Sequence, residues 1–344
     1  NYGLNASWTI YNGSKRLKTL KQERLNNQVA ELDIATSENT IKESIAQIYI
    51  QILYAAESVR VNENTLQVSI AQRDRGQELL NAGSIAKSDF AQLEAQVSTD
   101  RYQLVTAQAT LQDYKLQLKQ LLELDGENEM NVYLPNLSDE NVLAPLPAKK
   151  DVYVSALAIR PEIEASKLNV DASELGIDIA KSSYFPTISL SAGIGTNHTS
   201  ASDFTFGEQV KNGWNNSIGL SVSVPIFNNR QTKSAVQKAR LQRETNMLSL
   251  LDEQKALYKT IESLWLDANS AQQRYAAANE KLRSTQISYD LISEQFNLGM
   301  KNTVELLTEK NNLLQAQQEQ LQAKYMAILN TQLLKFYQGD KLAL

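Results

Sequence analysis

The side chains that most often carry out chemistry are scarce in this chain of 344 residues. It has no cysteine, which excludes disulfides, thiolate nucleophiles and thiolate metal sites. Its single histidine, His198, lies in a polar stretch, where such a residue is more often solvated than a ligand or a base. The carboxylates do not cluster with it or with a glycine-rich phosphate loop. We therefore predict no catalytic residue, no metal site and no cofactor, and we do not expect an enzyme.

Two bulk properties exclude further classes of protein. The net charge of −5 argues against a nucleic-acid partner, because proteins that bind nucleic acid usually present a basic face. No run of 18 or more apolar residues occurs, so we expect no transmembrane helix.

The positions of proline and glycine predict very long helices. All six prolines lie between Pro135 and Pro225, and long stretches on either side contain only Gly76 or only Gly299. Such stretches, rich in Gln, Leu, Ala, Lys and Glu, are typical of helices. A helix of about 70 residues spans roughly 100 Å, too long for a compact domain. We predict long helices over about 14–82 and 229–298, return helices over about 86–123 and 302–338, and a helix over about 160–183.

Apolar residues within these helices recur in alternating steps of four and three, the spacing of a coiled-coil seam. Small residues in the seams would allow helices to approach closely. The first seam is interrupted by Asn62. The seams contain Ile41, Ile45, Ile48, Ile52, Ala55, Val59 and Leu66; Leu104, Ala107, Leu111, Tyr114, Leu118 and Leu121; and Leu257, Ile261, Leu264, Ala268, Ala271, Tyr275, Ala278, Leu282, Tyr289, Ile292 and Phe296.

Three short segments alternate with period two and predict strands over 2–11, about 187–197 and about 216–227. One face of each is apolar and the other carries small or polar residues. This pattern suits a membrane-spanning strand, and it suits equally a half-buried strand of a soluble sheet. The alternation by itself leaves both interpretations open.

A gapless internal repeat relates each residue to the one 216 positions later, over about 120 residues. The segment 2–12 falls on 218–228, and 79–83 falls on 295–299. Each copy therefore contains a strand, a long helix, a glycine turn and a return helix. We predict a first structural repeat over 1–124, a connector over 125–159 and a second repeat over 160–344. The second copy follows a helix and a strand, so the first repeat is expected to lack its leading helix and strand.

Three motifs resemble the TolC family of outer-membrane efflux proteins. They are Ala156-Leu-Ala-Ile-Arg-Pro-Glu162, Tyr184-Phe-Pro-Thr-Ile-Ser-Leu-Ser-Ala-Gly-Ile-Gly195 and Ile218-Gly-Leu-Ser-Val-Ser-Val-Pro-Ile-Phe-Asn228. The first is similar to the entry to the family's second repeat, and the others to its helix-to-strand and strand-to-helix junctions. Each motif is weak alone, but their order and spacing together are specific.

This resemblance implies a mainly α fold with a membrane β-barrel portion, in a trimeric duct. The strands of a homotrimer would close one barrel in the outer membrane of a Gram-negative bacterium, and the helices would form a tunnel across the periplasm. Residues 196–216 would be an extracellular loop, and 125–159 would be an equatorial connector. The implied function is the exit duct of a tripartite efflux or type I secretion system. The cargo stays open, because the pump selects it.

The resemblance also implies a gate at the glycine turns. Aligned on the turn glycines, the family's basic gate residue falls on Lys301 and its hydroxyl-acid pair on Ser88 and Asp89. The family's inner acidic ring falls on Glu305 and on Thr308, of which only the first is acidic here. A closing link between Lys301 and Asp89 is thus predicted, and the alternative is that both are solvated charges near helix ends.

The tips of the helices are the expected docking site for partners. The resemblance places a periplasmic adaptor, the membrane fusion protein, against Gly83, Ser84, Ile85, Gly299 and Met300, and an inner-membrane pump at or beyond these tips. Outer-membrane lipid would surround the strands. A structural coiled-coil stalk without transport activity is the alternative function, but it accounts for neither the repeat nor the motifs.

Overall fold

The computed structural model describes residues 1–124, 130–133, 135 and 142–342. Residue contacts divide the chain into two units, each described below by itself. The strand unit contains Asn1–Thr36 and Arg160–Lys255, and the hairpin unit contains Ser37–Ile159 and Ala256–Leu344. Two helices of 67 residues, α1 (Lys15–Asn81) and α7 (Gln231–Asn297), run from one unit into the other.

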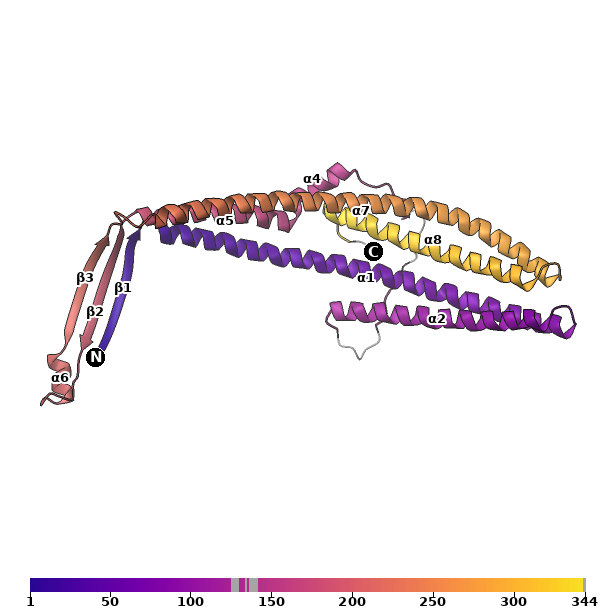
Figure 1. Ribbon diagram of the computed structural model, residues 1–344, viewed down its shortest axis with the longest axis horizontal. Helices are drawn as coiled ribbons and strands as arrows, with labels where there is room; N and C mark the ends of the chain where they lie inside the picture. The colour runs from indigo at the N-terminus through magenta and orange to yellow at the C-terminus, as the bar shows by residue number, and fades with distance from the viewer. Residues whose placement is uncertain (125–129, 134, 136–141, 343–344) are drawn as a thin grey trace. The chain divides into compact units, whose positions relative to one another are not determined.

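The strand unit is built around an antiparallel sheet in the order β1-β2-β3 (Figure 1). Its strands are β1 (Tyr2–Asn12), β2 (Thr187–Thr196) and β3 (Asn215–Ser223). Helix α5 (Pro161–Lys181) begins with a proline at its first turn, where the missing N–H has no helical partner to lose. A short 3-10 turn (Ser182–Tyr184) then leads into β2.

The register of the sheet gathers the apolar side chains on one face. Trp8 lies opposite Leu190, which lies opposite Leu220, and the same alignment joins the apolar residues on either side. A β-bulge at Ile10 shifts β1 by one residue, so that Tyr11 takes the place opposite Ile188. The predicted period-two pattern is therefore confirmed up to the bulge.

The end of the third strand was predicted wrongly. The alternation extended it to residue 227, but β3 ends at Ser223, and Ile226 is 95% exposed. Pro225 has no N–H to donate to a neighbouring strand and restrains the residue before it, so the ladder ends ahead of it.

Two short helices fall where the sequence indicated only connections. Helix α6 (Phe206–Asn212) lies within the predicted loop 196–216, and its capping box joins Thr205 and Glu208. Helix α4 (Lys149–Ile159) occupies the last part of the connector 125–159. Half of the remainder of that connector, residues 125–129, 134 and 136–141, lies outside the described residues.

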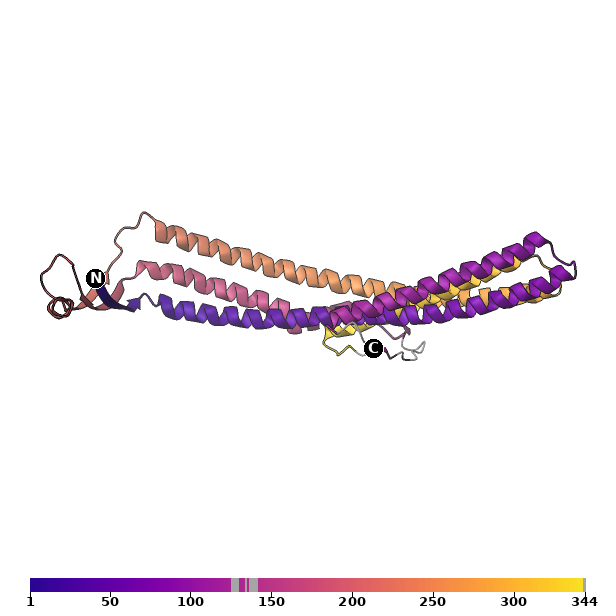
Figure 2. The same ribbon diagram turned by 90° about the horizontal axis from the view of Figure 1, so that it is seen from below.

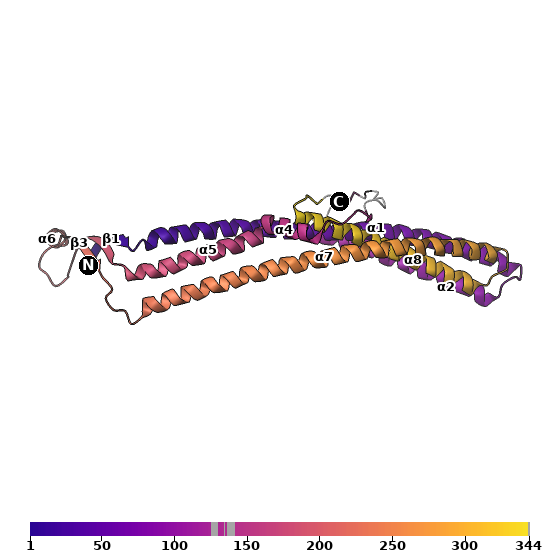
Figure 3. The same cartoon turned by 90° about the horizontal axis from the view of Figure 1, so that it is seen from above.

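The hairpin unit consists of two antiparallel helical hairpins. The C-terminal part of α1 pairs with α2 (Lys87–Leu121), and the C-terminal part of α7 pairs with α8 (Thr303–Gln338). Figures 1, 2 and 3 show these hairpins from three sides. Side chains of α8 supply most of the core. The main cluster of buried residues contains Ala46, Ile50, Leu53, Val142, Ala271, Tyr275, Leu321, Ala323, Tyr325, Ala327, Ile328, Leu329 and Leu333.

Most residues of the predicted seams are buried or half-buried. On α7 the seam residues Leu257, Ile261, Ala268, Ala271, Tyr275, Ala278 and Phe296 are all buried. On α1 burial begins only after Ile41, which is 47% exposed. On α2, Leu118 is buried and the other seam residues are half-buried. None of the described helices is long and apolar enough to span a bilayer.

The repeat is visible in the backbone. Its offset carries the first and last residues of α1 onto those of α7, and the junction before each helix has two consecutive residues with positive φ. These are Gly13 and Ser14 before α1, and Asn229 and Arg230 before α7. Both copies therefore turn from strand to helix through the same left-handed backbone conformation.

Gly76 is a buried helical glycine whose replacement we expect to be destabilising. A Cβ atom there would lie 2.3 Å from Cδ1 of Leu93, which is itself 1% exposed. Crowding of this kind costs about 1–3 kcal/mol, more than the gain of about 0.5–1 kcal/mol from alanine in a helix. Gly76→Ala should lower the apparent Tm in detergent. Gly176→Ala is the control, because its Cβ would meet only the flexible amide of Gln22 at 3.4 Å; it should raise the Tm. A higher Tm for both variants would contradict the packing argument.

Candidate functional site

The site predicted by the sequence lies at the two turns that close the hairpins. Each long helix ends with a glycine of φ +74°, Gly83 in one hairpin and Gly299 in the other. In the first turn the N–H of Gly83 donates to the Leu80 carbonyl at 2.9 Å, and the N–H of Ser84 donates to the Leu79 carbonyl at 2.8 Å. This is the Schellman pattern, which favours glycine because its central residue is left-handed.

The second turn repeats this pattern with the same distances. The N–H of Gly299 donates to the Phe296 carbonyl at 2.9 Å, and the N–H of Met300 donates to the Gln295 carbonyl at 2.8 Å. A Cβ atom on either glycine would meet nothing within 4 Å. The glycines are therefore required by the backbone conformation and not by packing.

Two of the predicted gate residues cap the return helices. The carboxylate of Asp89 accepts a hydrogen bond from the backbone N–H of Ala86 at 3.3 Å, at the start of α2. Glu305 accepts one from the N–H of Asn302 at 3.2 Å, and the Asn302 side chain accepts from the N–H of Glu305 at 2.9 Å. The second helix start is thus a complete capping box, whereas the first lacks a side-chain acceptor at Ala86.

Lys301 pairs with Glu305 within the chain. Its Nζ lies 2.5 Å from Oε1 of Glu305, one helical turn further on. The structure pairs Lys301 with Glu305 and not with Asp89, so the closing link between Lys301 and Asp89 stays a prediction. Ser88 and Thr308 are exposed, and the Thr308 hydroxyl donates to the Val304 carbonyl at 2.7 Å.

The tips expose several of the residues predicted to meet a partner. Ser84 and Gly83 are exposed, Ile85 is half-buried, and Met300 is 69% exposed. Leu298 beside the second turn is equally exposed. Each tip therefore presents a small surface that includes apolar side chains.

A small apolar core lies just inside the turns. It contains Leu93 from α2, Phe296 from α7 and Leu306 from α8, all at most 2% exposed. Leu79 of α1 packs against it, so all four helices contribute. This core joins the two hairpins close to the tips.

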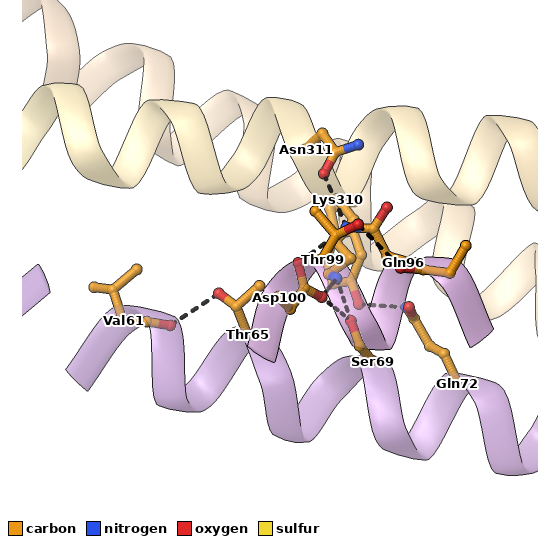
Figure 4. A network of polar contacts seen from close by, with 11 residues as sticks. Val61, Thr65, Ser69, Gln72, Gln96, Thr99, Asp100, Lys310 and Asn311 are labelled. Atoms are coloured by element: carbon orange, nitrogen blue, oxygen red, sulfur yellow. Dashed lines mark hydrogen bonds and ion pairs between the residues drawn. The ribbon is translucent and has the colours of Figure 1, made fainter. Parts of the chain in front are cut away.

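A buried polar cluster lies further along the same helices and was not predicted from the sequence. We call Ser69, Asp100 and Lys310 the seam cluster; they come from α1, α2 and α8, and each is at most 3% exposed (Figure 4). Lys310 Nζ donates to Asp100 Oδ2 and to the Ser69 hydroxyl, which itself donates to Asp100 Oδ2. The second oxygen of Asp100 accepts from Gln96 Nε2 at 2.9 Å.

Nothing in the described part of the chain resembles a metal centre: no group of three or more histidine, aspartate or glutamate side chains there could hold an ion. The notable side chains are instead capping, ion-pairing and seam residues at helix ends and interfaces.

Comparison with known proteins assigns the family. The sequence profile described as "Outer membrane efflux protein" matches residues 152–339, which is more than half of the chain. The chain belongs to the outer membrane efflux protein family. BepC of Brucella suis is 25% identical over 294 residues, covering 85% of this chain and 61% of BepC. TolC of Escherichia coli is 25% identical over 341 residues, covering 95% of this chain and 66% of TolC. The chain thus spans about three fifths to two thirds of these curated relatives.

Solved structures show that this family member has the fold of known channels. CusC superposes with a TM-score of 0.84 at 19% identity, over 98% of this chain and 77% of CusC. VceC from Vibrio cholerae superposes with a TM-score of 0.81 at 17% identity, over 99% of this chain and 80% of VceC. The fold class predicted from the sequence, mainly α with a β portion in a TolC-like arrangement, is confirmed.

The Lys301–Glu305 pair makes the titration of Glu305 a direct test of the tip geometry. The Lys301 ammonium and the Asn302 N–H hold the pKa of Glu305 below its ordinary value of 4.5. A carboxylate with a depressed pKa contributes stability above its ordinary pKa, and the contribution is lost as the pH falls through the folded value. Lys301→Met should raise the pKa of Glu305 part of the way to 4.5, because the capping bond remains. The carboxyl ¹³C shift of Glu305, assigned with Glu305→Gln, measures this, and an unchanged pKa would contradict the pair.

Proposed function

We propose that the chain is a subunit of a homotrimeric outer-membrane exit duct of a Gram-negative bacterium. In this proposal it is the passive channel component of a tripartite efflux or type I secretion system. The strands would lie in the outer membrane, the helices would extend into the periplasm, and the helical tips would open and close the path. No bond is made or broken, so the proposal requires no catalytic group.

The exposed apolar face of the sheet is the observation that carries this proposal. Along its middle, Trp8 is 65% exposed, Leu220 is 67% exposed and Ile218 is 84% exposed. The opposite face carries small and polar residues such as Asn5, Ser191 and Gly219. An apolar face beside a polar face is the pattern of a barrel strand with lipid outside and water inside. The alternative, a half-buried strand of a soluble sheet, would need a covering layer, and the described part of the strand unit offers none for this face.

The physical need for such a duct is simple. A polar cargo crosses the hydrocarbon core of a membrane slowly, so it requires a continuous path lined by water. Strands that close between subunits satisfy their backbone hydrogen bonds within the membrane. Long coiled-coil hairpins can then extend the path without any hydrophobic span of their own.

Partners are proposed at the tips. Gly83, Ser84, Ile85, Gly299 and Met300 would contact a periplasmic adaptor protein, with an inner-membrane pump beyond it. Among the relatives, AprF is described as an alkaline protease secretion protein and OpmQ as a pyoverdine export protein. The cargoes in these two names are a protein and a small molecule. The similarity to these relatives therefore assigns no cargo to this chain.

A structural coiled-coil stalk is the alternative function, and biochemical behaviour separates the two. The full-length protein should fractionate with the outer membrane, require detergent for extraction, and migrate as a heat-resistant trimer. A monomeric rod that stays in solution without detergent would favour the stalk.

A further inference from the structure

The seam cluster replaces apolar contacts with a buried ion pair at one level of the hairpin unit. Asp100 is 1% exposed and Lys310 is 3% exposed, so neither charge is solvated. Burial lowers the pKa of Lys310, and the hydrogen bond and charge of Asp100 act in the opposite direction. A second contact, from Gln96 Nε2 to Asn311 Oδ1 at 3.5 Å, joins the same two helices nearby.

The cluster joins the two repeats, and the positions that the repeat relates to it do not carry the same residues. The offset of the repeat relates Asp100 to Ala316, which is fully buried. The same relation pairs Lys310 with Glu94 and Ser69 with Thr285. The two hairpins therefore differ at this level. Because the charged groups must pair, they fix one position of α8 against α1 and α2.

The cluster differs in kind from the contacts nearer the tips. Apolar contacts such as Leu93 with Phe296 are non-directional, so they can rearrange while remaining buried. A buried ion pair has fixed geometry, and separating its members leaves charges without water. The half-buried pair of Lys301 and Glu305 carries a much smaller penalty, because solvent reaches both side chains and can replace either partner.

We propose that Ser69, Asp100 and Lys310 form a fixed pivot for movement of the tips. They act as positioning residues: they hold α8 against α1 and α2 while the segments between them and the turn glycines move. Ser69 precedes Gly83 and Asp100 follows it, whereas Lys310 follows Gly299. At a rise of about 1.5 Å per residue, the moving segments between the cluster and the turns are roughly 15–25 Å long. This inference rests on the proposed opening at the tips.

Backbone hydrogen exchange of the full-length protein in detergent tests the pivot. In the wild type, exchange should be fast in residues 70–99 and 298–309 and slow beyond the cluster. Asp100→Asn leaves Lys310 buried without its counter-charge. It should speed exchange in both tip segments at least tenfold and move the slow region away from the tips. Lys310→Met, which keeps the apolar stem, should act in the same direction. In planar bilayers both variants should spend more time in the open state.

Asp113→Asn is the matched control, since it makes the same change on an exposed side chain of the same helix. Its exchange should equal that of the wild type. Equal tip exchange in Asp100→Asn and Asp113→Asn would overturn the pivot, and so would an increase spread uniformly over all helices. Hydrogen exchange can be measured on a protein that does not conduct. Failure to conduct would therefore refute the proposed function, whereas the exchange rates alone decide whether the cluster is a pivot.

Discussion

Replacing Leu220 with lysine is expected to abolish assembly of the trimer in the outer membrane. Leu220 lies opposite Leu190 near the middle of the apolar sheet face. A lysine on the lipid side of a barrel costs about 2–4 kcal/mol near the membrane midplane, and a trimer would carry it three times. The heat-resistant trimer recovered from outer-membrane fractions measures this effect.

Ser221→Lys provides the matched control for Leu220→Lys. Ser221 is the next residue of β3 and lies opposite Ser189 on the small and polar face. A lysine there should face water in the lumen, so the trimer should form as in the wild type. Equal assembly of the two variants would contradict the assignment of the sheet faces.

Reversing the charge of Lys301 should increase single-channel conductance several-fold. Lys301→Glu removes the ion pair with Glu305 and puts a like charge beside it. In the closed state the new charge would also repel Asp89, its predicted partner in the closing link. The repulsion from Asp89 favours separation of the tips. Planar-bilayer recordings compare this variant with Lys87→Glu, which makes the same charge change on the first turn of α2 and should leave conductance unchanged.

Two neutral variants identify the partner through which Lys301 acts. Asp89→Asn should raise conductance if the predicted link between Lys301 and Asp89 closes the tips. Glu305→Gln should raise it if the pair within the chain is the restraint. If Lys301→Glu conducts like the wild type, these residues do not form a gate.

Much of the tip geometry was accessible from sequence because it depends on local rules. The turn glycines follow from helix ends, and the offset of the repeat makes Gly299 the equivalent of Gly83. The pair of Lys301 with Glu305 has the spacing of one helical turn, which favours contact. The family resemblance pointed only to the distant partner Asp89, so the local partner Glu305 was not predicted.

The seam cluster was partly predictable. Continuing the seam of α2 back from Leu104 in steps of four and three reaches Asp100 and then Val97. On α8, Lys310 likewise lies four positions after Leu306 and three before Leu313. Charges at seam positions indicate a buried pair. Which helix supplies the partner depends on how the hairpins pack, and no local pattern determines that. The early end of β3 reflects Pro225, whose effect on the ladder outweighs the alternation around it.

Conductance of the purified full-length protein in planar lipid bilayers tests the central claim most directly. If the chain is a subunit of an exit duct, the trimer should insert and produce discrete current steps of uniform size. Their conductance should be small while the tips are closed, and Lys301→Glu should enlarge the same steps. A trimer that inserts into the bilayer and passes no current, in the wild type and in Lys301→Glu alike, would contradict the account.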